Sequence, residues 1–129
     1  MEHEDSAALA AIYQDELFSA AAYRQLAHWI PEHSGALHQL SNQNRAGAAC
    51  IRGICNLRSI TAPACAAYEN SRLPVHDLLR KCCSRELKCF TGYENHRTDP
   101  EFGCVFACLA ARKAEHILKM LEIAGSIER

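Results

Sequence analysis

The stretch RELKCFTGYENHRTDPEFGCVFACLAARKAEHILKMLEIAG, residues 85–125, decides the fold because it contains the clearest helix start in the chain. At its centre, residues 99–101 (Asp-Pro-Glu) supply a capping side chain, a proline at the first helical position and an acid in the first turn. Apolar residues recur at helical spacing on both sides of this start. The stretch therefore predicts one helix over 74–98 and another over 100–124.

The N-terminal half shows the same pattern twice. Residues 5–30 contain no Gly or Pro and stop before Pro31, and a second helix is expected over 34–58. The link within each helix pair is a few residues long, so the two helices of a pair must lie antiparallel. Residues 59–73 form a longer link that, when extended, exceeds the length of a helix of about 25 residues. The third helix is therefore expected to run parallel to the second.

These elements predict an all-α fold, a ferritin-like four-helix bundle in which two antiparallel helix pairs are joined by a long crossover. A chain of 129 residues fits one such domain, residues 1–129. A simple up-down bundle stays open as an alternative at this stage.

Composition narrows the class of protein. The net charge is -1, with 14 basic and 15 acidic residues, so no electrostatic footprint for nucleic acid is expected. No window of 18 apolar residues predicts a membrane span, and the acidic N-terminus does not resemble a signal peptide. The eight cysteines are therefore expected to be reduced and mostly buried in a cytoplasmic protein.

Four polar residues interrupt the apolar helix stripes. Glu16, Glu86, Lys113 and His116 each occupy a position where a bundle core expects Leu. A carboxylate is almost never fully buried without a partner, so we expect these side chains to meet at one level of the core. Carboxylates and an imidazole that converge in a bundle core are suitable ligands for a divalent metal.

An internal repeat links the two helix pairs. At an offset of 70 residues, Glu16 pairs with Glu86 and Tyr23 pairs with Tyr93. The same offset pairs Gln43 with Lys113 and Ala46 with His116, although either Gln43 or Asn44 fits the inward stripe of its helix, followed by Gly47 and Cys50. The repeat indicates a bundle with internal two-fold symmetry.

From about Tyr13 to Gly125, the chain resembles the ferritin-like superfamily and is similar to small rubrerythrin-type domains. The resemblance is specific in residues 85–125 and weak in the second helix. It implies a di-iron centre held by one Glu from each of the first and third helices and a Glu-x-x-His from each of the others. On this basis Glu16, Glu86 and His116 correspond to ligands, and Tyr23 and Tyr93 are expected in the core or beside the ligands.

The chain departs from the family pattern at three ligand positions, where it carries Gln43, Ala46 and Lys113. Two interpretations of this degenerate centre follow. In one, the core is free of metal, and Lys113 pairs with the two carboxylates in a Glu/Lys/His network. In the other, Glu16, Glu86 and His116 retain a single iron or other divalent metal. Retained activity, which in the family would be that of a di-iron oxidoreductase or peroxidase, is not expected.

Two alternatives come from other classes of protein. Five cysteines on or near the inward stripes could line a bundle that binds Cu(I), a soft metal that prefers thiolates: Cys50, Cys82, Cys89, Cys104 and Cys108. The bundle could instead be a non-catalytic interaction module that dimerises through a helix face. The family resemblance implies a homodimer formed through the first two helices, and the sequence identifies no substrate.

Overall fold

The computed structural model describes residues 2–61, 64 and 67–127. Within these residues it contains four α-helices, a short 3-10 turn (Pro31–His33) and no strand, so the all-α prediction is confirmed. The helices are α1 (Glu2–Trp29), α2 (Ser34–Leu57), α3 (Val75–Asn95) and α4 (Gly103–Ser126).

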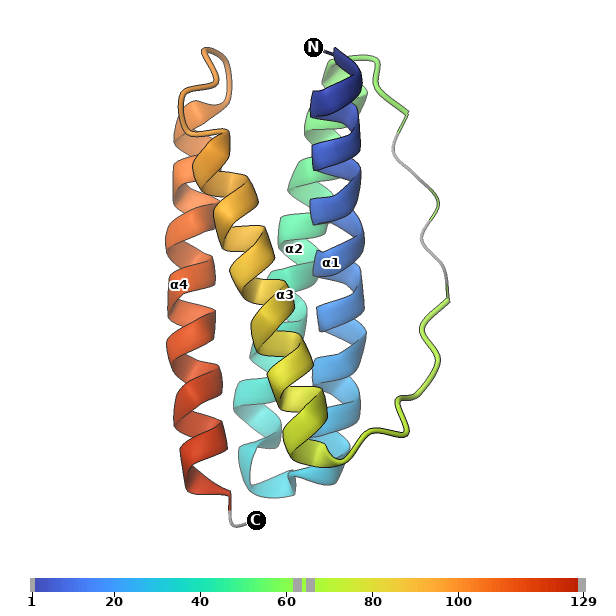
Figure 1. Cartoon of the computed structure of the whole chain (residues 1–129), viewed down its shortest axis with the longest axis vertical. Helices are drawn as coiled ribbons and strands as arrows, with labels where there is room; N and C mark the ends of the chain where they lie inside the picture. Colours follow the sequence, from blue (N-terminus) through green and yellow to red (C-terminus); the bar gives the residue numbers. More distant parts are fainter. Residues whose placement is uncertain (1, 62–63, 65–66, 128–129) are drawn as a thin grey trace.

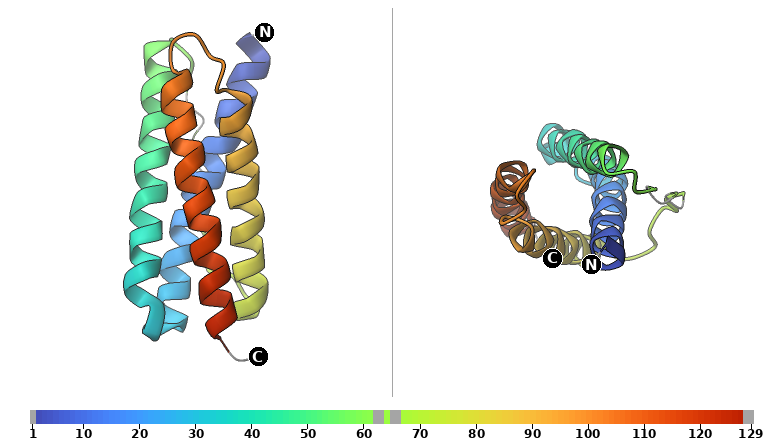
Figure 2. Two further views of the ribbon diagram at one scale, coloured as in Figure 1. Left: turned by 90° about the vertical axis from the view of Figure 1, so that its left-hand side faces the viewer. Right: turned by 90° about the horizontal axis from the view of Figure 1, so that it is seen from above.

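The helices form a bundle whose four members surround one core, as the end-on view in Figure 2 shows. α1 packs against α2, α3 packs against α4, and α1 also contacts α3. The chain leaves α2 at one end of the bundle and enters α3 at the other, so α2 and α3 run in the same direction (Figure 1). Each short turn reverses the chain, which makes both helix pairs antiparallel.

The core consists of two apolar clusters with a polar layer between them. Leu9, Ile51 and Phe106 belong to the first cluster, and Leu26 and Met120 belong to the second. The polar residues buried between the clusters come from all four helices: Glu16, Asn44, Glu86, Lys113 and His116. The apolar clusters exclude water from both sides of this layer, which strengthens every charge interaction inside it.

The turn between α3 and α4 is longer than the sequence predicted. α3 ends at Asn95 rather than near 98, and α4 begins at Gly103 rather than 100. Asp99 does act as a cap, since its Oδ1 accepts backbone N–H bonds from Glu101 at 2.9 Å and Phe102 at 2.8 Å. The residues that it orders form a turn before the helix instead of the first helical turn.

Gly103 explains the later start of α4. A Cβ on this residue would overlap the backbone oxygen of Arg97, so only glycine allows the turn to approach the helix so closely. Arg58, from the end of α2, donates to both oxygens of Asp99 at 2.7 and 2.8 Å and stacks on Phe102. These contacts fasten the α3–α4 turn to α2.

Gln25 of α1 binds the segment that precedes α3 through three hydrogen bonds. Gln25 Nε2 donates to the Ser71 carbonyl at 2.8 Å, and Gln25 Oε1 accepts from the Ser71 N–H at 2.9 Å and from the Tyr68 hydroxyl. No helix in the described part of the chain is both long enough and apolar enough to cross a bilayer.

Candidate functional site

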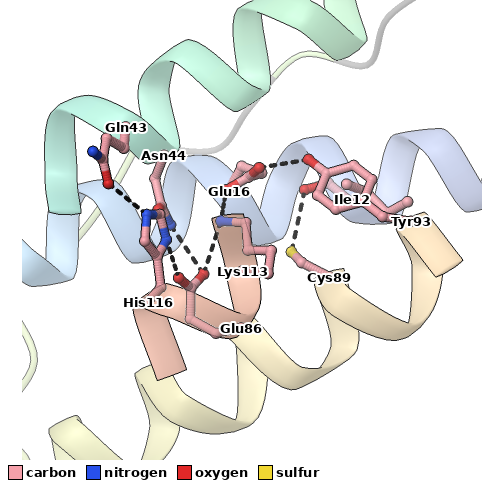
Figure 3. A network of polar contacts seen from close by, with 9 residues as sticks. All are labelled: Ile12, Glu16, Gln43, Asn44, Glu86, Cys89, Tyr93, Lys113 and His116. Carbon is pink, nitrogen blue, oxygen red and sulfur yellow. Dashed lines mark hydrogen bonds and ion pairs between the residues drawn. The ribbon is translucent and has the colours of Figure 1, made fainter. Parts of the chain in front are cut away.

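Lys113 lies at the centre of the polar layer. Its Nζ donates to Glu16 Oε1 from α1 and, at 3.1 Å, to Glu86 Oε1 from α3 (Figure 3). The three side chains are fully buried, Lys113 being only 1% exposed. The ammonium thus joins two helices to α4 at a level of the core that water does not reach.

His116, one turn after Lys113 on α4, completes the layer. Its Nδ1 bonds Glu86 Oε2 at 2.8 Å, and its Nε2 lies 2.7 Å from Gln43 Oε1 on α2. Asn44 Nδ2 also donates to Glu86 Oε1, at 3.1 Å. Glu86 therefore receives hydrogen bonds from both α2 and α4, and it connects the two helix pairs.

The two repeat-related tyrosines lie beside the carboxylates in a crosswise manner. The Tyr93 hydroxyl of α3 donates to Glu16 Oε2 of α1 at 2.5 Å. Tyr23 of α1 is buried near Glu86 of α3, and its hydroxyl has no hydrogen-bond partner among the described residues. Burial, together with the Glu86 charge, raises the pKa of Tyr23 well above its ordinary value, so the phenol stays protonated.

Burial and neighbouring charges shift the pKa values of the charged groups in this layer. Burial raises the pKa of Glu16 despite the opposing effect of Lys113. Burial also acts to raise the pKa of Glu86, but hydrogen bonds and charge from His116 and Lys113 outweigh it and lower that pKa. For Lys113, burial favours the neutral amine, yet the two carboxylates outweigh it and raise its pKa. The site is thus an ammonium held between two carboxylates.

Gly47 makes room for Glu16. A Cβ at this position would overlap Glu16 Oε2, so the α2 backbone approaches the carboxylate directly. Asn44 and Gly47 are fully buried on the inward face of α2, whereas Gln43 is half-buried and Ala46 is exposed.

The prediction that Ala46 corresponds to His116 is therefore wrong by one residue. Asn44 and Gly47 face Glu86 and Glu16, so the offset that relates α2 to α4 is 69 (113 − 44) rather than 70. The sequence contained a signal for this register, because Asn44 and Gly47 lie three residues apart on the inward stripe. Only Gln43, through its contact with His116, keeps a place in the network.

Cys89 is the cysteine that lies closest to the site. Its Sγ and one oxygen from each of Glu16 and Glu86 all lie within 4.8 Å of one another. Burial raises the pKa of Cys89 far above its ordinary value, so the group is a neutral thiol, and Sγ contacts the Ile12 carbonyl at 4.0 Å. Burial likewise raises the pKa of Cys82 to about 12. Neither thiol is reactive as it stands.

The expected lining of cysteines is contradicted by the structure. Cys50, Cys104 and Cys108 are exposed on the outer faces of α2 and α4, and only Cys82 and Cys89 of the five expected residues are buried. Cys55, which the stripe pattern did not select, is buried instead. A thiol in the core and a thiol on the outer face of a helix cannot share a Cu(I) ion, so the five expected cysteines do not line the described part of the core. Cys65 lies outside the described residues.

The residues present do not fit a di-iron centre. Two irons need bridging carboxylates, and among the described residues the buried site contains only Glu16 and Glu86. The corresponding positions on α2 are Asn44 and Gly47, which offer an amide and no side chain at all. Lys113 contacts both carboxylates and brings a positive charge to the place where the metals would have to lie.

A shallow cleft between α2 and α4 leads toward the site. It has a volume of about 160 Å³, and its walls include Gln43, His116, Glu115 and Lys119. His116 is 2% exposed and lies behind Gln43, so the cleft ends at the hydrogen bond between them. Neither a protein-family model, nor a curated protein sequence, nor a solved structure matches this chain.

Proposed function

We propose that the protein is a ferritin-like, rubrerythrin-related bundle whose di-iron centre is replaced by a metal-free network of Glu16, Glu86, Lys113 and His116. On this proposal it is not an oxidase or a ferroxidase but a non-catalytic module that acts through its surface, as a homodimer. The observation that carries the proposal is the contact of the buried Lys113 ammonium with both carboxylates.

The charge balance supports a network without metal. Two carboxylates face one ammonium and one imidazole whose two nitrogens both lie beside oxygen atoms. Each carboxylate oxygen of Glu16 and Glu86 thus has a hydrogen-bond partner supplied by the protein, from Lys113, Tyr93, Asn44 or His116. A divalent cation added to this set would have to displace the ammonium or share the core with it, at a high cost in desolvation and repulsion.

Metal analysis tests the proposal directly. We expect the protein, purified after growth with added iron or added copper, to contain less than about one tenth of an equivalent of any metal. Lys113→Glu should bind iron, because it removes the ammonium and adds a carboxylate; Lys88→Glu, at an exposed position of α3, serves as its control. One equivalent of metal in the unaltered protein, lost in Glu16→Gln, would overturn the proposal.

Stability gives a second measurement of the same contact. Lys113→Met removes the ammonium from between two buried carboxylates, and we expect it to lower the free energy of unfolding by about 3–5 kcal/mol. Lys119→Met removes a surface pair with Glu122 and should change it by less than about 1 kcal/mol. Equal effects in urea unfolding would contradict a buried, charged Lys113.

A second candidate function rests on Cys89. Because its sulfur lies with the Glu16 and Glu86 oxygens, these three donors would form a single-metal site if Lys113 moved aside. Titration with Co²⁺ distinguishes this case, since a cobalt–thiolate bond adds strong near-ultraviolet absorption. That absorption, lost in Cys89→Ser and kept in Cys82→Ser, would favour this candidate; its absence would favour the metal-free network.

A further inference from the structure

The outer side of α4 carries a stripe of apolar residues that runs the length of the helix, bordered by the exposed Glu115 and Glu122 and, at Leu121, by a groove against α3. Residues that point away from the bundle recur with the alternating three- and four-residue spacing of a heptad, and we call them the outer α4 stripe: Cys104, Ala107, Ala111, Ala114, Leu118, Leu121 and Gly125. Leu118 is 68% exposed and Leu121 is 58% exposed, and Ala107 and Ala114 are half-buried. The outer α4 stripe lies on a different side of the helix from the buried residues Phe106, Lys113 and Met120.

A surface helix normally presents charged residues on the face that the outer α4 stripe occupies. A heptad of apolar residues is instead the pattern by which one helix packs against another over a long seam. α4 already uses its other face to pack against α3 and the core. The stripe therefore provides a second, separate packing surface.

The sizes of the residues in the stripe show what fits it. Its first half contains only small side chains, from Cys104 to Ala114, and its second half contains Leu118 and Leu121. In a second copy that lies antiparallel, Leu118 would meet Ala107, Leu121 would meet Cys104, and Ala111 would meet Ala114. Each large residue faces a small one, as close packing requires. A parallel copy would set leucine against leucine and leave a gap between the small residues.

Charge supports the same arrangement. Glu115 borders the stripe at its midpoint, on the side toward α2, and Arg112 lies about one helical turn before it. In the antiparallel pair, Arg112 of each copy would lie next to Glu115 of the other, so two reciprocal ion pairs would form about the two-fold axis. Such rim pairs contribute little affinity, but they fix orientation and register.

We propose that the outer α4 stripe is the interface of a homodimer in which two α4 helices pack antiparallel, with Ala111 against Ala114 of the second copy. This identifies the surface and the partner in the interaction role proposed above, and it does not depend on whether the core binds metal. The stripe spans about 32 Å of helix. A contact between two single helices of this length is expected to bury an area near the lower limit for a specific interface. A reversible dimer with micromolar affinity is expected.

Sedimentation equilibrium over a range of protein concentrations tests the interface. Leu118→Glu and Leu121→Glu should each weaken dimerisation at least about 30-fold, while circular dichroism shows that the helices remain folded. Leu57→Glu is the matched control, because Leu57 is 75% exposed at the end of α2 and lies outside the stripe. The proposal is overturned if the protein is a monomer at all concentrations. It is also overturned if Leu118→Glu leaves the dimer intact, as it would if the interface lay on α1 and α2.

Disulfide trapping tests the antiparallel register. In a background with Cys50, Cys104 and Cys108 changed to Ala, a mixture of Ala111→Cys and Ala114→Cys chains should form a crosslinked heterodimer on oxidation. Ala111→Cys alone should crosslink poorly, because the two copies of residue 111 are offset by three residues, about 4.5 Å. Efficient self-crosslinking of Ala111→Cys would show a parallel pair or a shifted antiparallel register, and either would overturn the proposed pairing of Ala111 with Ala114. Metal content is measured on the same samples, so a failed dimer and a metal-bound core are separate results.

Discussion

Lys113 carries its charge at a level of the core where water cannot solvate it, so its neighbours must supply all of the stabilisation. They do so from three helices, through Glu16, Glu86 and the groups that bond those carboxylates in turn. A layer of this kind holds α1, α3 and α4 in one relative position, because any shift would leave a charge buried without a partner.

Gly47 tests how closely the backbone of α2 packs on this layer. We expect Gly47→Ala to lower the free energy of unfolding by about 1–3 kcal/mol, because the added methyl would overlap Glu16 Oε2 and move the carboxylate away from Lys113. Gly53→Ala, in the same helix, has open space around its added methyl and should raise the free energy of unfolding by about 0.5–1 kcal/mol. Urea unfolding measures both, and a stabilising Gly47→Ala would show that Glu16 does not contact α2.

At the scale of the element, the end of α2 shows how a helix stops without glycine. Ile60 N–H donates to the Cys55 carbonyl at 2.8 Å, and Ser59 N–H donates to the Asn56 carbonyl at 3.3 Å. This pair of hydrogen bonds defines a Schellman motif. The motif places Ser59 at φ 56°, a conformation that side chains disfavour. Ile60 then packs on the core, so the motif directs the chain out of the bundle.

We therefore expect Ser59→Gly to raise the free energy of unfolding by about 0.5–1 kcal/mol, since glycine adopts the required φ without strain. Ser84→Gly is the control with the opposite expected sign. Because Ser84 is exposed in the middle of α3, this substitution should lower the free energy of unfolding by a similar amount. Thermal unfolding of both variants measures the two effects. A destabilised Ser59→Gly would indicate that the Ser59 side chain makes a contact worth more than the strain.

At the scale of the whole molecule, the buried groups that titrate at alkaline pH all hold their protons more tightly than in the unfolded chain. Burial raises the pKa of Tyr23, Tyr93, Cys82 and Cys89, and carboxylates raise that of Lys113 against the effect of burial. Because the native state binds these protons more strongly, their contribution to stability is complete below the unfolded pKa values and falls as the pH rises above them.

The ordinary pKa of a cysteine is 9.0 and that of a lysine is 10.5, so the loss of stability should begin near pH 9 and become steeper toward pH 11. We expect the free energy of unfolding in urea to fall by as much as about 1.4 kcal/mol per pH unit for each group involved. Tyr93→Phe removes one of these groups and should reduce the slope. A free energy that stays constant from about pH 8 to pH 11 would contradict the buried, protonated state of these residues.

Much of the fold follows from local pattern. The periodicity of apolar residues and the positions of Pro31, Pro74 and residues 99–101 predict the four helices with their ends within a few residues. The largest errors lie at the α3–α4 turn and at the start of α1, which the structure extends to Glu2. Local pattern does not predict this turn, because Gly103 lies against the Arg97 carbonyl, a contact that forms only when the two helices are packed.

The sequence by itself determined that Glu16, Glu86, Lys113 and His116 lie on inward stripes, because helical periodicity fixes which residues share a face. Only the tertiary structure decided which side of α2 meets them, and which cysteines reach the core. One residue changes the direction of a side chain by about 100° around its helix, so Gln43 and Asn44 look alike in a stripe and yet contact different groups. The rotation of each helix about its own axis is set by its packing against the other three, and that information is not local to any one helix.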